Sequence, residues 1–224
     1  MDVLGRIADV GIVPVIEISD AELAVPLADA LLSAGLPCAE ITFRTAAAAD
    51  AIKAIAEQRP GVLVGAGTVL TSQQLDQALD AGARFVVSPG FDAAVVGRCL
   101  ERIATPLPGV VTPTEVQAAI GHGLGAAKFF PAEAAGGPAY LRALAGPFPA
   151  FRFIPSGGIT LDNLERYLAI PSVTAVGSSW PVASDLLAAR DLGEVESRAR
   201  EMVLKVRRFR QAPSGGRGRD GRQR

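Results

Sequence analysis

Residues 12–32 read IVPVIEISDAELAVPLADALL and contain one complete strand-and-helix unit. Residues 12–18 are rich in β-branched side chains, which favour a β-strand. Ser19 and Glu22 have the spacing of a capping box, in which two side chains satisfy the free amides at a helix start. The apolar residues that follow recur at the spacing of one helix face: Ala24, Leu27, Ala28, Leu31 and Leu32. This stretch therefore predicts a β-strand that leads directly into an α-helix.

The same unit recurs along the chain. Short apolar runs follow one another at intervals of roughly 19 to 25 residues: 12–18, 38–43, 62–67, 85–88, 107–111, 126–129, 151–155 and 173–176. Segments rich in Ala and Leu, with helical periodicity, separate these runs. Two further capping boxes, which start at Thr71 and Thr112, each follow a predicted strand.

Eight strands that alternate with helices imply parallel pairing and right-handed crossovers. In a chain of 224 residues, this alternation predicts an α/β fold, a single (β/α)8 TIM barrel over residues 1–212. A doubly wound open sheet is the alternative fold. In a barrel, the chemistry is expected where the strands end and the following loops begin.

Composition limits the class of protein. The chain is 49% apolar and 20% charged, which excludes disorder for most of its length. Apolar runs are too short to span a bilayer, and the charges at Asp2, Arg6 and Asp9 argue against a signal peptide. Two cysteines make no disulfide framework, and a single histidine excludes a zinc site built on several histidines. We therefore predict a cytoplasmic protein with no bound metal and no membrane partner.

Residues 213–224, PSGGRGRDGRQR, differ from the rest of the chain. Four arginines and one aspartate give them a formal net charge of +3, so residues 1–212 carry −4 of the total of −1. Because the segment lacks apolar periodicity, we predict a short disordered C-terminal tail. A solvated terminus is favoured over a nucleic-acid or membrane contact, because the segment is short and has no aromatic residue. The acidic remainder predicts no nucleic-acid partner.

Lys128 is the strongest candidate for chemistry. It interrupts an apolar strand, GAAKFF, that has no neighbouring acid in the sequence. Burying an ammonium is costly, and a neutral amine can attack a carbonyl to form a Schiff base. The alternative is a lysine that extends its charge to solvent from a short strand.

Glu40 is the candidate for proton transfer. On its strand it shares one face with Cys38, Thr42 and Arg44, while the apolar face packs on helices. A carboxyl group inside a barrel is unusual and suits proton shuttling, unless it only forms an ion pair with Arg44. Glu17 and Glu133 are rival carboxylates that lie nearer to loops.

Two glycine-containing turns follow the last two predicted strands: residues 156–158 (SGG) and 177–179 (GSS). TIM barrels commonly bind phosphate there, through backbone amides and hydroxyl groups. Each turn alone is also consistent with an ordinary tight turn, but the pair at both positions predicts an anion site.

These residues, with further short blocks, give the chain a specific resemblance. The blocks are residues 14–16 (PVI), 40–45 (EITFRT), 64–70 (VGAGTVL), 88–90 (SPG), 128–133 (KFFPAE), 136–137 (GG), 145–148 (AGPF), 156–159 (SGGI) and 177–180 (GSSW). From about residue 10 to about residue 205 the sequence resembles the bacterial 2-keto-3-deoxy-6-phosphogluconate (KDPG) aldolases, a family that also includes 4-hydroxy-2-oxoglutarate (KHG) aldolase activity.

The resemblance implies a class I aldolase on a (β/α)8 barrel, a homotrimer without metal or cofactor, that cleaves a phosphorylated keto sugar acid to pyruvate and glyceraldehyde 3-phosphate. Lys128 then matches the Schiff-base lysine, and Glu40 matches the general acid/base. The remaining matches concern substrate binding. They are Arg44 and Thr68 for the pyruvate carboxylate, Pro89 and Phe130 for the apolar walls, and Ser156, Gly157, Gly158 and Ser179 for the phosphate. The family often has threonine where Ser156 stands, which leaves the sugar stereochemistry open.

Three other functions stay open at the level of sequence. The first is an aldolase for the galactonate-derived sugar acid. The second is a phosphate-binding isomerase or epimerase, which uses Glu40 for proton abstraction and forms no covalent adduct. The third is a sensor of a phosphorylated ligand, which needs neither Lys128 nor Glu40.

Overall fold

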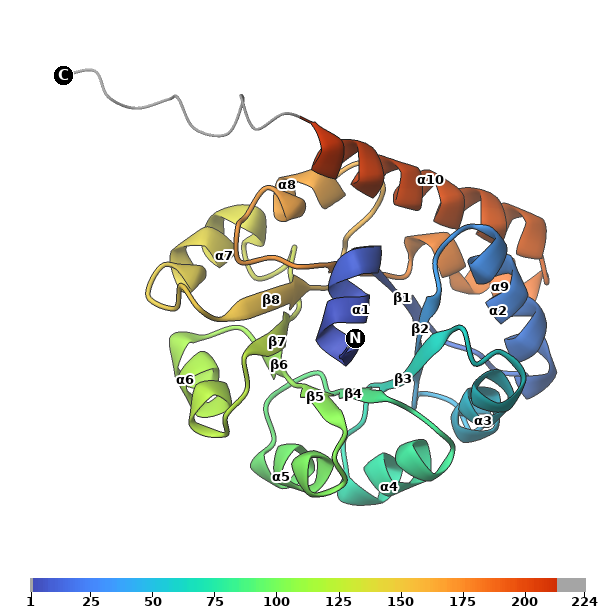
Figure 1. Ribbon diagram of the computed structural model, residues 1–224, viewed down its shortest axis with the longest axis horizontal. Helices are drawn as coiled ribbons and strands as arrows, with labels where there is room; N and C mark the ends of the chain where they lie inside the picture. The colour runs from blue at the N-terminus through green and yellow to red at the C-terminus, as the bar shows by residue number, and fades with distance from the viewer. Residues whose placement is uncertain (1, 213–224) are drawn as a thin grey trace.

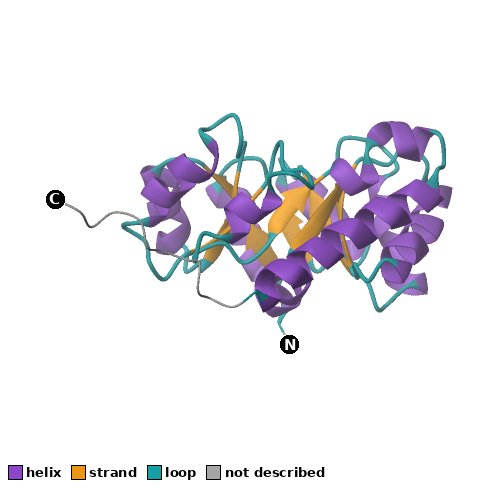
Figure 2. Ribbon diagram, turned by 90° about the horizontal axis from the view of Figure 1, so that it is seen from above, coloured by secondary structure: helices purple, strands orange, loops and turns teal. Residues whose placement is uncertain are grey.

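A curved parallel β-structure lies inside a ring of helices in the computed structural model, which describes residues 2–212 (Figures 1 and 2). The strands are β1 (Ile12–Ile16), β2 (Cys38–Thr42), β3 (Leu63–Gly67), β4 (Phe85–Val87), β5 (Thr105–Leu107), β6 (Gly109–Val110), β7 (Ala126–Phe129), β8 (Arg152–Pro155) and β9 (Val176–Ser178). The α-helices are α1 (Val3–Val10), α2 (Ala24–Ser33), α3 (Ala48–Gln58), α4 (Ser72–Asp80), α5 (Ala93–Glu101), α6 (Pro113–Gly121), α7 (Gly137–Ala145), α8 (Leu164–Leu168), α9 (Ser184–Ala188) and α10 (Leu192–Gln211). Two short 3-10 helices are η1 (Ala21–Leu23) and η2 (Trp180–Val182).

All strand pairs run parallel, as the alternation of strands and helices predicts. One sheet has the order β5-β4-β3-β2-β1-β9, and a second has the order β6-β7-β8. Two isolated parallel bridges, Phe153 with Val173 and Ser156 with Gly177, connect β8 to the segment that contains β9. The predicted parallel α/β architecture is therefore confirmed, with its strands divided between two sheets.

The prediction of one continuous strand over residues 107–111 is wrong. Pro108 separates β5 from β6, because proline has no amide hydrogen to donate to a sheet. The chain at β6 also passes close to the loop after β4. A Cβ atom built on Gly109 would lie 2.0 Å from the carbonyl oxygen of Pro89, so only glycine fits there.

The predicted helix starts are confirmed at two of three places. Thr112 and Glu115 form the complete capping box of α6, and the Thr71 hydroxyl caps α4 by accepting from the amide of Gln74. The capping box predicted at Ser19 is wrong. The carboxylate of Asp20 takes that position by accepting from the Glu22 amide at 2.9 Å, which starts η1 before α2 begins.

An amino-terminal helix, α1, closes one end of the strands. It begins after Asp2, whose side chain accepts from the Gly5 amide, and it ends at Gly11 in the left-handed conformation. Its apolar residues Val3, Leu4 and Ile7 pack on an inner core that the strands provide: Val13, Cys38, Leu63, Phe85, Val87, Leu107, Ala126, Ile154 and Ala175. Because β1 starts directly after α1, this helix covers the amino-terminal ends of the strands, in the centre of Figure 1.

The last helix, α10, holds α1 in place. The guanidinium of Arg210 donates to the carbonyl oxygens of Asp9 and Ala8 at 2.7 Å, and to that of Thr174 at 3.2 Å. The contacts with Ala8 and Asp9 satisfy carbonyl groups at the end of α1 that have no partner inside the helix. Residues 2–212 contain no helix that is both long and apolar enough to cross a bilayer. The predicted tail, residues 213–224, lies outside the described residues.

Candidate active site

The side chain of Lys128, on β7, contacts the side chain of Glu40, on β2. Lys128 Nζ lies 3.3 Å from Glu40 Oε1, and the two residues are only 8% and 3% exposed. Gly67 leaves room for the carboxylate, because a Cβ atom there would lie 2.4 Å from Glu40 Oε1. Lys128 Nζ also lies 5.1 Å from the centre of the Phe130 ring. The lysine that has no acidic neighbour in the sequence thus has one in space.

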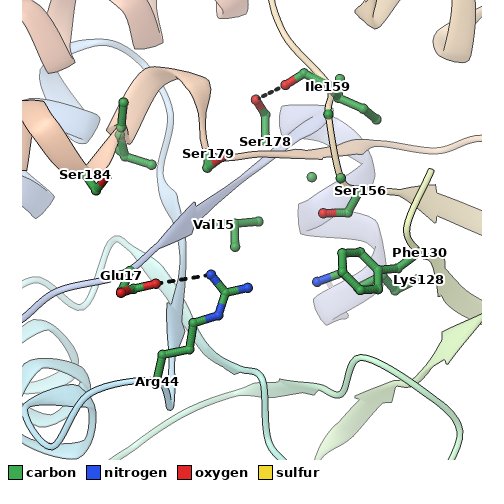
Figure 3. Close-up of a pocket in the computed structure, with 15 residues that line it drawn as sticks. Val15, Glu17, Arg44, Lys128, Phe130, Ser156, Ile159, Ser178, Ser179 and Ser184 are labelled. Carbon is green, nitrogen blue, oxygen red and sulfur yellow. Dashed lines mark hydrogen bonds and ion pairs between the residues drawn. The ribbon is translucent and has the colours of Figure 1, made fainter. Parts of the chain in front are cut away.

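A cavity of about 300 Å³ opens at Lys128, beyond the carboxyl ends of β1, β7, β8 and β9 (Figure 3), and Glu40 lies outside its wall. Its wall consists of strand ends and the loops that follow them: Val15, Glu17, Arg44, Lys128, Phe130, Ser156, Gly157, Gly158, Ile159, Gly177, Ser178, Ser179, Val182, Ala183 and Ser184. Seven residues predicted from the sequence therefore line one cavity: Arg44, Lys128, Phe130, Ser156, Gly157, Gly158 and Ser179.

Arg44 reaches into the cavity from the loop after β2. Its Nη1 donates to Glu17 Oε2 at 3.2 Å, and both side chains are about half exposed (Figure 3). The alternative of a Glu40–Arg44 ion pair is therefore not formed, since Glu40 pairs with Lys128. An arginine keeps several donors after one such bond, so this guanidinium can still bind a carboxylate.

The turn after β8 lies against the loop after β7 and beside β9. Gly157 and Gly158 have φ angles of +102° and +79°, which favour glycine. A Cβ atom on Gly177 would lie 2.7 Å from Ser156 Oγ, so the two turns approach each other closely. Ser179 is exposed in the cavity, whereas Ser178 is buried and donates to the Ile159 carbonyl at 2.6 Å.

Thr68 and Pro89 lie apart from the cavity wall. Thr68 follows β3 directly and has a left-handed backbone, with φ of +55°. Pro89 is in the loop after β4, half-buried, with its carbonyl against Gly109. Both lie at the carboxyl ends of strands, at the same end of the sheet as the cavity.

Sequence reasoning missed some of the cavity wall. Ser184 and Val15 carry no recognisable signal, because one begins a short helix and the other looks like any apolar strand residue. Of the rival carboxylates, Glu17 lines the cavity but is paired with Arg44, and Glu133 accepts a hydrogen bond from Tyr167. Within residues 2–212, no cluster of three or more His, Cys, Asp or Glu side chains is arranged to hold a metal.

A buried amine in contact with a carboxylate, below a polar cavity, has the parts that Schiff-base chemistry needs. The amine can add to a carbonyl carbon, and the carboxylate can accept and return a proton. The arginine and the glycine-containing turn at the mouth can hold negatively charged groups.

Comparison with known proteins gives a consistent answer. The family profile “KDPG and KHG aldolase” matches residues 3–198. The 2-dehydro-3-deoxy-phosphogluconate aldolase of Treponema pallidum (strain Nichols) is 48% identical over 194 residues, 87% of this chain and 92% of that protein. The structure of KDPG aldolase from Legionella pneumophila, with pyruvate captured as a covalent carbinolamine intermediate, has a TM-score of 0.86 and 36% identity, and the match covers 89% of this chain and 97% of that one.

A second solved structure is also similar. It is the 2-keto-3-deoxy-6-phosphogluconate aldolase of Zymomonas mobilis ZM4 with 3-phosphoglycerate, which has a TM-score of 0.84 and 39% identity. That match covers 90% of this chain and 95% of the other. Because the family profile, the curated relative and both structures match most of the sequence, the chain belongs to the KDPG and KHG aldolase family.

Proposed function

We propose that this protein is a class I aldolase that cleaves 2-dehydro-3-deoxy-6-phosphogluconate to pyruvate and glyceraldehyde 3-phosphate. We propose cleavage of 4-hydroxy-2-oxoglutarate to pyruvate and glyoxylate as a second activity. Membership of the family makes the protein an aldehyde-lyase. The observation that carries the assignment to this chain is the contact of 3.3 Å between Glu40 Oε1 and the Nζ of Lys128, which lines the cavity.

In the proposed mechanism, Lys128 first passes a proton to Glu40 and becomes a neutral amine. The amine adds to the C2 carbonyl of the substrate, and loss of water from the carbinolamine gives an iminium ion. Glu40, again a carboxylate after releasing its proton to the departing hydroxyl, accepts the proton of the C4 hydroxyl, directly or through a water molecule. The C3–C4 bond then breaks, and its electron pair moves into the iminium to form an enamine.

The second half returns the enzyme to its starting state. The aldehyde leaves, and Glu40 returns its proton to C3 of the enamine. Water then adds to the resulting iminium, and hydrolysis releases pyruvate and leaves Lys128 as the ammonium ion, paired again with the Glu40 carboxylate. The captured carbinolamine in the Legionella relative supports this sequence of covalent steps. No cofactor is needed, because the iminium itself accepts the electrons.

We assign the binding of the pyruvate half to four residues. Arg44 and Thr68 hold the carboxylate, and Pro89 and Phe130 form apolar walls. Arg44 is supported by its place on the cavity wall, and Phe130 by its ring next to Lys128 Nζ. A planar guanidinium also matches the geometry of a carboxylate. Thr68 and Pro89 rest on the family resemblance and on their position at strand ends.

We assign the phosphate to Ser156, Gly157, Gly158 and Ser179, which line the same cavity. The support is threefold: left-handed glycines that let the backbone approach an anion, hydroxyl groups beside them, and a phosphorylated ligand in the Zymomonas relative. Phosphate bound there helps to position the reacting carbons at Lys128.

The proposal extends to the whole molecule. We propose that the strands make up a complete (β/α)8 barrel, supported by the parallel bridges from β8 toward β9. A homotrimer and a cytoplasmic location follow from the family resemblance, as does the absence of a nucleic-acid or membrane partner. Each is a proposal for this chain.

The test is a retro-aldol assay combined with trapping. Release of pyruvate is measured from the phosphorylated gluconate-derived and galactonate-derived substrates, and the enzyme is then incubated with pyruvate and borohydride. The sequence contains only three lysines, Lys53, Lys128 and Lys205, so mass spectrometry assigns the reduced adduct without ambiguity. The proposal expects an adduct at Lys128 and faster release from the gluconate-derived substrate.

Other outcomes identify the alternatives. No adduct with turnover of a phosphorylated sugar points to an isomerase or epimerase, and binding without turnover points to a sensor. Faster release from the other epimer assigns the galactonate-derived substrate.

A further inference from the structure

The phosphate turn, residues 156–158, rests on the loop that follows β7. The amide of Ala132 donates to the Ser156 carbonyl at 2.8 Å, and the amide of Glu133 donates to the Gly157 carbonyl at 3.1 Å. The third carbonyl of the turn, that of Gly158, accepts from Asn163 Nδ2 at 2.9 Å. All three carbonyl groups are therefore bonded within the protein, and the backbone path of the turn depends on these neighbours.

The side chain of Glu133 supports the same turn from below. A Cβ atom built on Gly158 would lie 2.9 Å from Glu133 Cγ and 3.0 Å from its Cβ. The stem of Glu133 therefore packs directly against the Gly158 backbone. Gly158 has to be glycine for this reason as well as for its φ of +79°.

Tyr167 fixes the other end of Glu133. The Tyr167 hydroxyl, on α8, donates to Glu133 Oε1, and Tyr167 is fully buried. A buried hydroxyl needs a partner, so the carboxylate and the ring hold each other in one arrangement. Burial is the main reason, and the hydrogen bond to Glu133 the second, that the pKa of the Tyr167 hydroxyl lies well above its ordinary value. The hydroxyl therefore stays a donor.

Glu133 has no place in the proton transfer. Glu40 contacts Lys128 directly, whereas Glu133 is bonded to the Tyr167 hydroxyl. Its carboxylate oxygen is instead engaged at the contact between α8, the loop after β7 and Gly158.

We propose that Glu133, held by Tyr167, is a positioning residue that fixes the turn of residues 156–158 in the shape that binds the substrate phosphate. This inference rests on the proposed function, because it assigns a task to the phosphate turn. Its consequence is selective. Loosening the pair weakens the binding of the phosphate and leaves the chemistry at Lys128 unchanged, because neither Glu133 nor Tyr167 lines the cavity into which Lys128 opens.

The experiment compares Tyr167→Phe and Glu133→Ala with wild-type enzyme on two substrates. These are 2-dehydro-3-deoxy-6-phosphogluconate and its non-phosphorylated counterpart, 2-dehydro-3-deoxygluconate. Each variant should raise KM for the phosphorylated substrate by about 5- to 10-fold, with kcat within about twofold, and should leave kcat/KM for the other substrate nearly unchanged. Glu133→Gln keeps an oxygen that can accept from Tyr167, so it should restore most of the affinity.

Two controls separate this role from general stability. Tyr140→Phe removes the hydroxyl of the other tyrosine, which donates to the Val111 carbonyl at 2.8 Å, away from the phosphate turn. It should leave both substrates unaffected. The double variant Glu133→Ala/Tyr167→Phe should be no worse than Glu133→Ala alone, because that single change already removes the hydrogen bond from Tyr167.

The outcomes are distinct for the two proposals. Wild-type enzyme that releases pyruvate from neither substrate overturns the proposed function. Wild-type enzyme that is active, with variants that lose efficiency equally on both substrates or on neither, overturns the positioning role and leaves the proposed function standing. Glu133→Ala changes an exposed side chain and keeps the test decisive if Tyr167→Phe does not fold.

Discussion

Lys128 Nζ and Glu40 Oε1 lie 3.3 Å apart although the two residues are 88 positions apart in the sequence. The pair joins β7 to β2 across the inside of the strands, with side chains that are only 10% and 4% exposed. Each charge is therefore balanced mainly by the other, and a change at one residue alters the environment of its partner.

Lys128→Met should destabilise the protein as well as abolish turnover. Methionine replaces the stem of the lysine with similar volume, but it leaves the Glu40 carboxylate buried and unpaired. Removing one partner of a buried ion pair costs about 3–5 kcal/mol. Adding Glu40→Gln to Lys128→Met should recover most of that loss, as measured by denaturant unfolding of the four proteins. Equal stability of Lys128→Met and wild type would show that water already solvates this pair.

Glu40→Gln alone should keep the fold and bind substrate, because the amide has nearly the same shape as the carboxylate. Turnover should fall by roughly 10²–10⁴-fold, which is the usual contribution of a positioned acid/base group. The measurement is single-turnover release of pyruvate, with Glu57→Gln on the exposed surface of α3 as the control. A single-turnover rate near that of wild type would mean that another group or a water molecule accepts the proton.

Ser179→Asp should discriminate between substrates. A carboxylate beside a bound phosphate repels it, and water screens the repulsion only in part within a cavity. We expect kcat/KM to fall at least about tenfold more for the phosphorylated substrate than for its non-phosphorylated counterpart. Borohydride labelling of Lys128 by pyruvate should persist. Equal losses on both substrates would remove Ser179 from the phosphate site.

Neither cysteine should react with a thiol reagent in the folded protein at pH 8. Burial, and secondarily the charge of Glu40, raises the pKa of Cys38 to about 12, and burial raises the pKa of Cys99 to about 12. The thiolate is the reactive form, so labelling should find no accessible thiol in native protein and two after denaturation. Rapid labelling of native protein would mean that the core opens locally.

The raised pKa values of the same two thiols also predict how the free energy of unfolding changes at high pH. Their folded pKa values exceed the ordinary value of 9.0, so the folded state holds its protons to higher pH than the unfolded state. This contribution to the free energy of unfolding is complete below pH 9 and is lost between about pH 9 and about pH 12. Denaturant titrations of wild type and Cys38→Ala should converge over that range.

The strands and seven residues of the cavity wall were predictable because their signals are local. A lysine within GAAKFF and glutamate on the polar face of CAEITF are visible in a few consecutive residues. The turns at residues 156–158 and 177–179 can be recognised because they follow the last two of the eight predicted strands. Recognising these features requires only the two-residue period of a strand and knowledge of which residues lie at its carboxyl end.

What the sequence did not reveal depends on distant partners or on competition between neighbours. The pairing of Arg44 with Glu17 rather than Glu40, and of Glu133 with Tyr167, is decided by packing between segments far apart in the chain. At the first helix start, Asp20 outcompetes Ser19, since both side chains are good caps and only geometry selects one. Helix α1 had a usable signal, with Asp2 before it and Gly11 after it.

The contact between Arg210 and α1 has a consequence for how the protein is made. Arg210 is synthesised 201 residues after Asp9, whose carbonyl oxygen it binds. Protein chains emerge from the ribosome with their amino-terminal residues first. Helix α1 therefore lacks this hydrogen-bond donor until almost all of the described chain has been translated. The hydrogen bonds at the end of α1 can thus form only late in biosynthesis, and a ribosome stalled before residue 210 would hold a chain that lacks them.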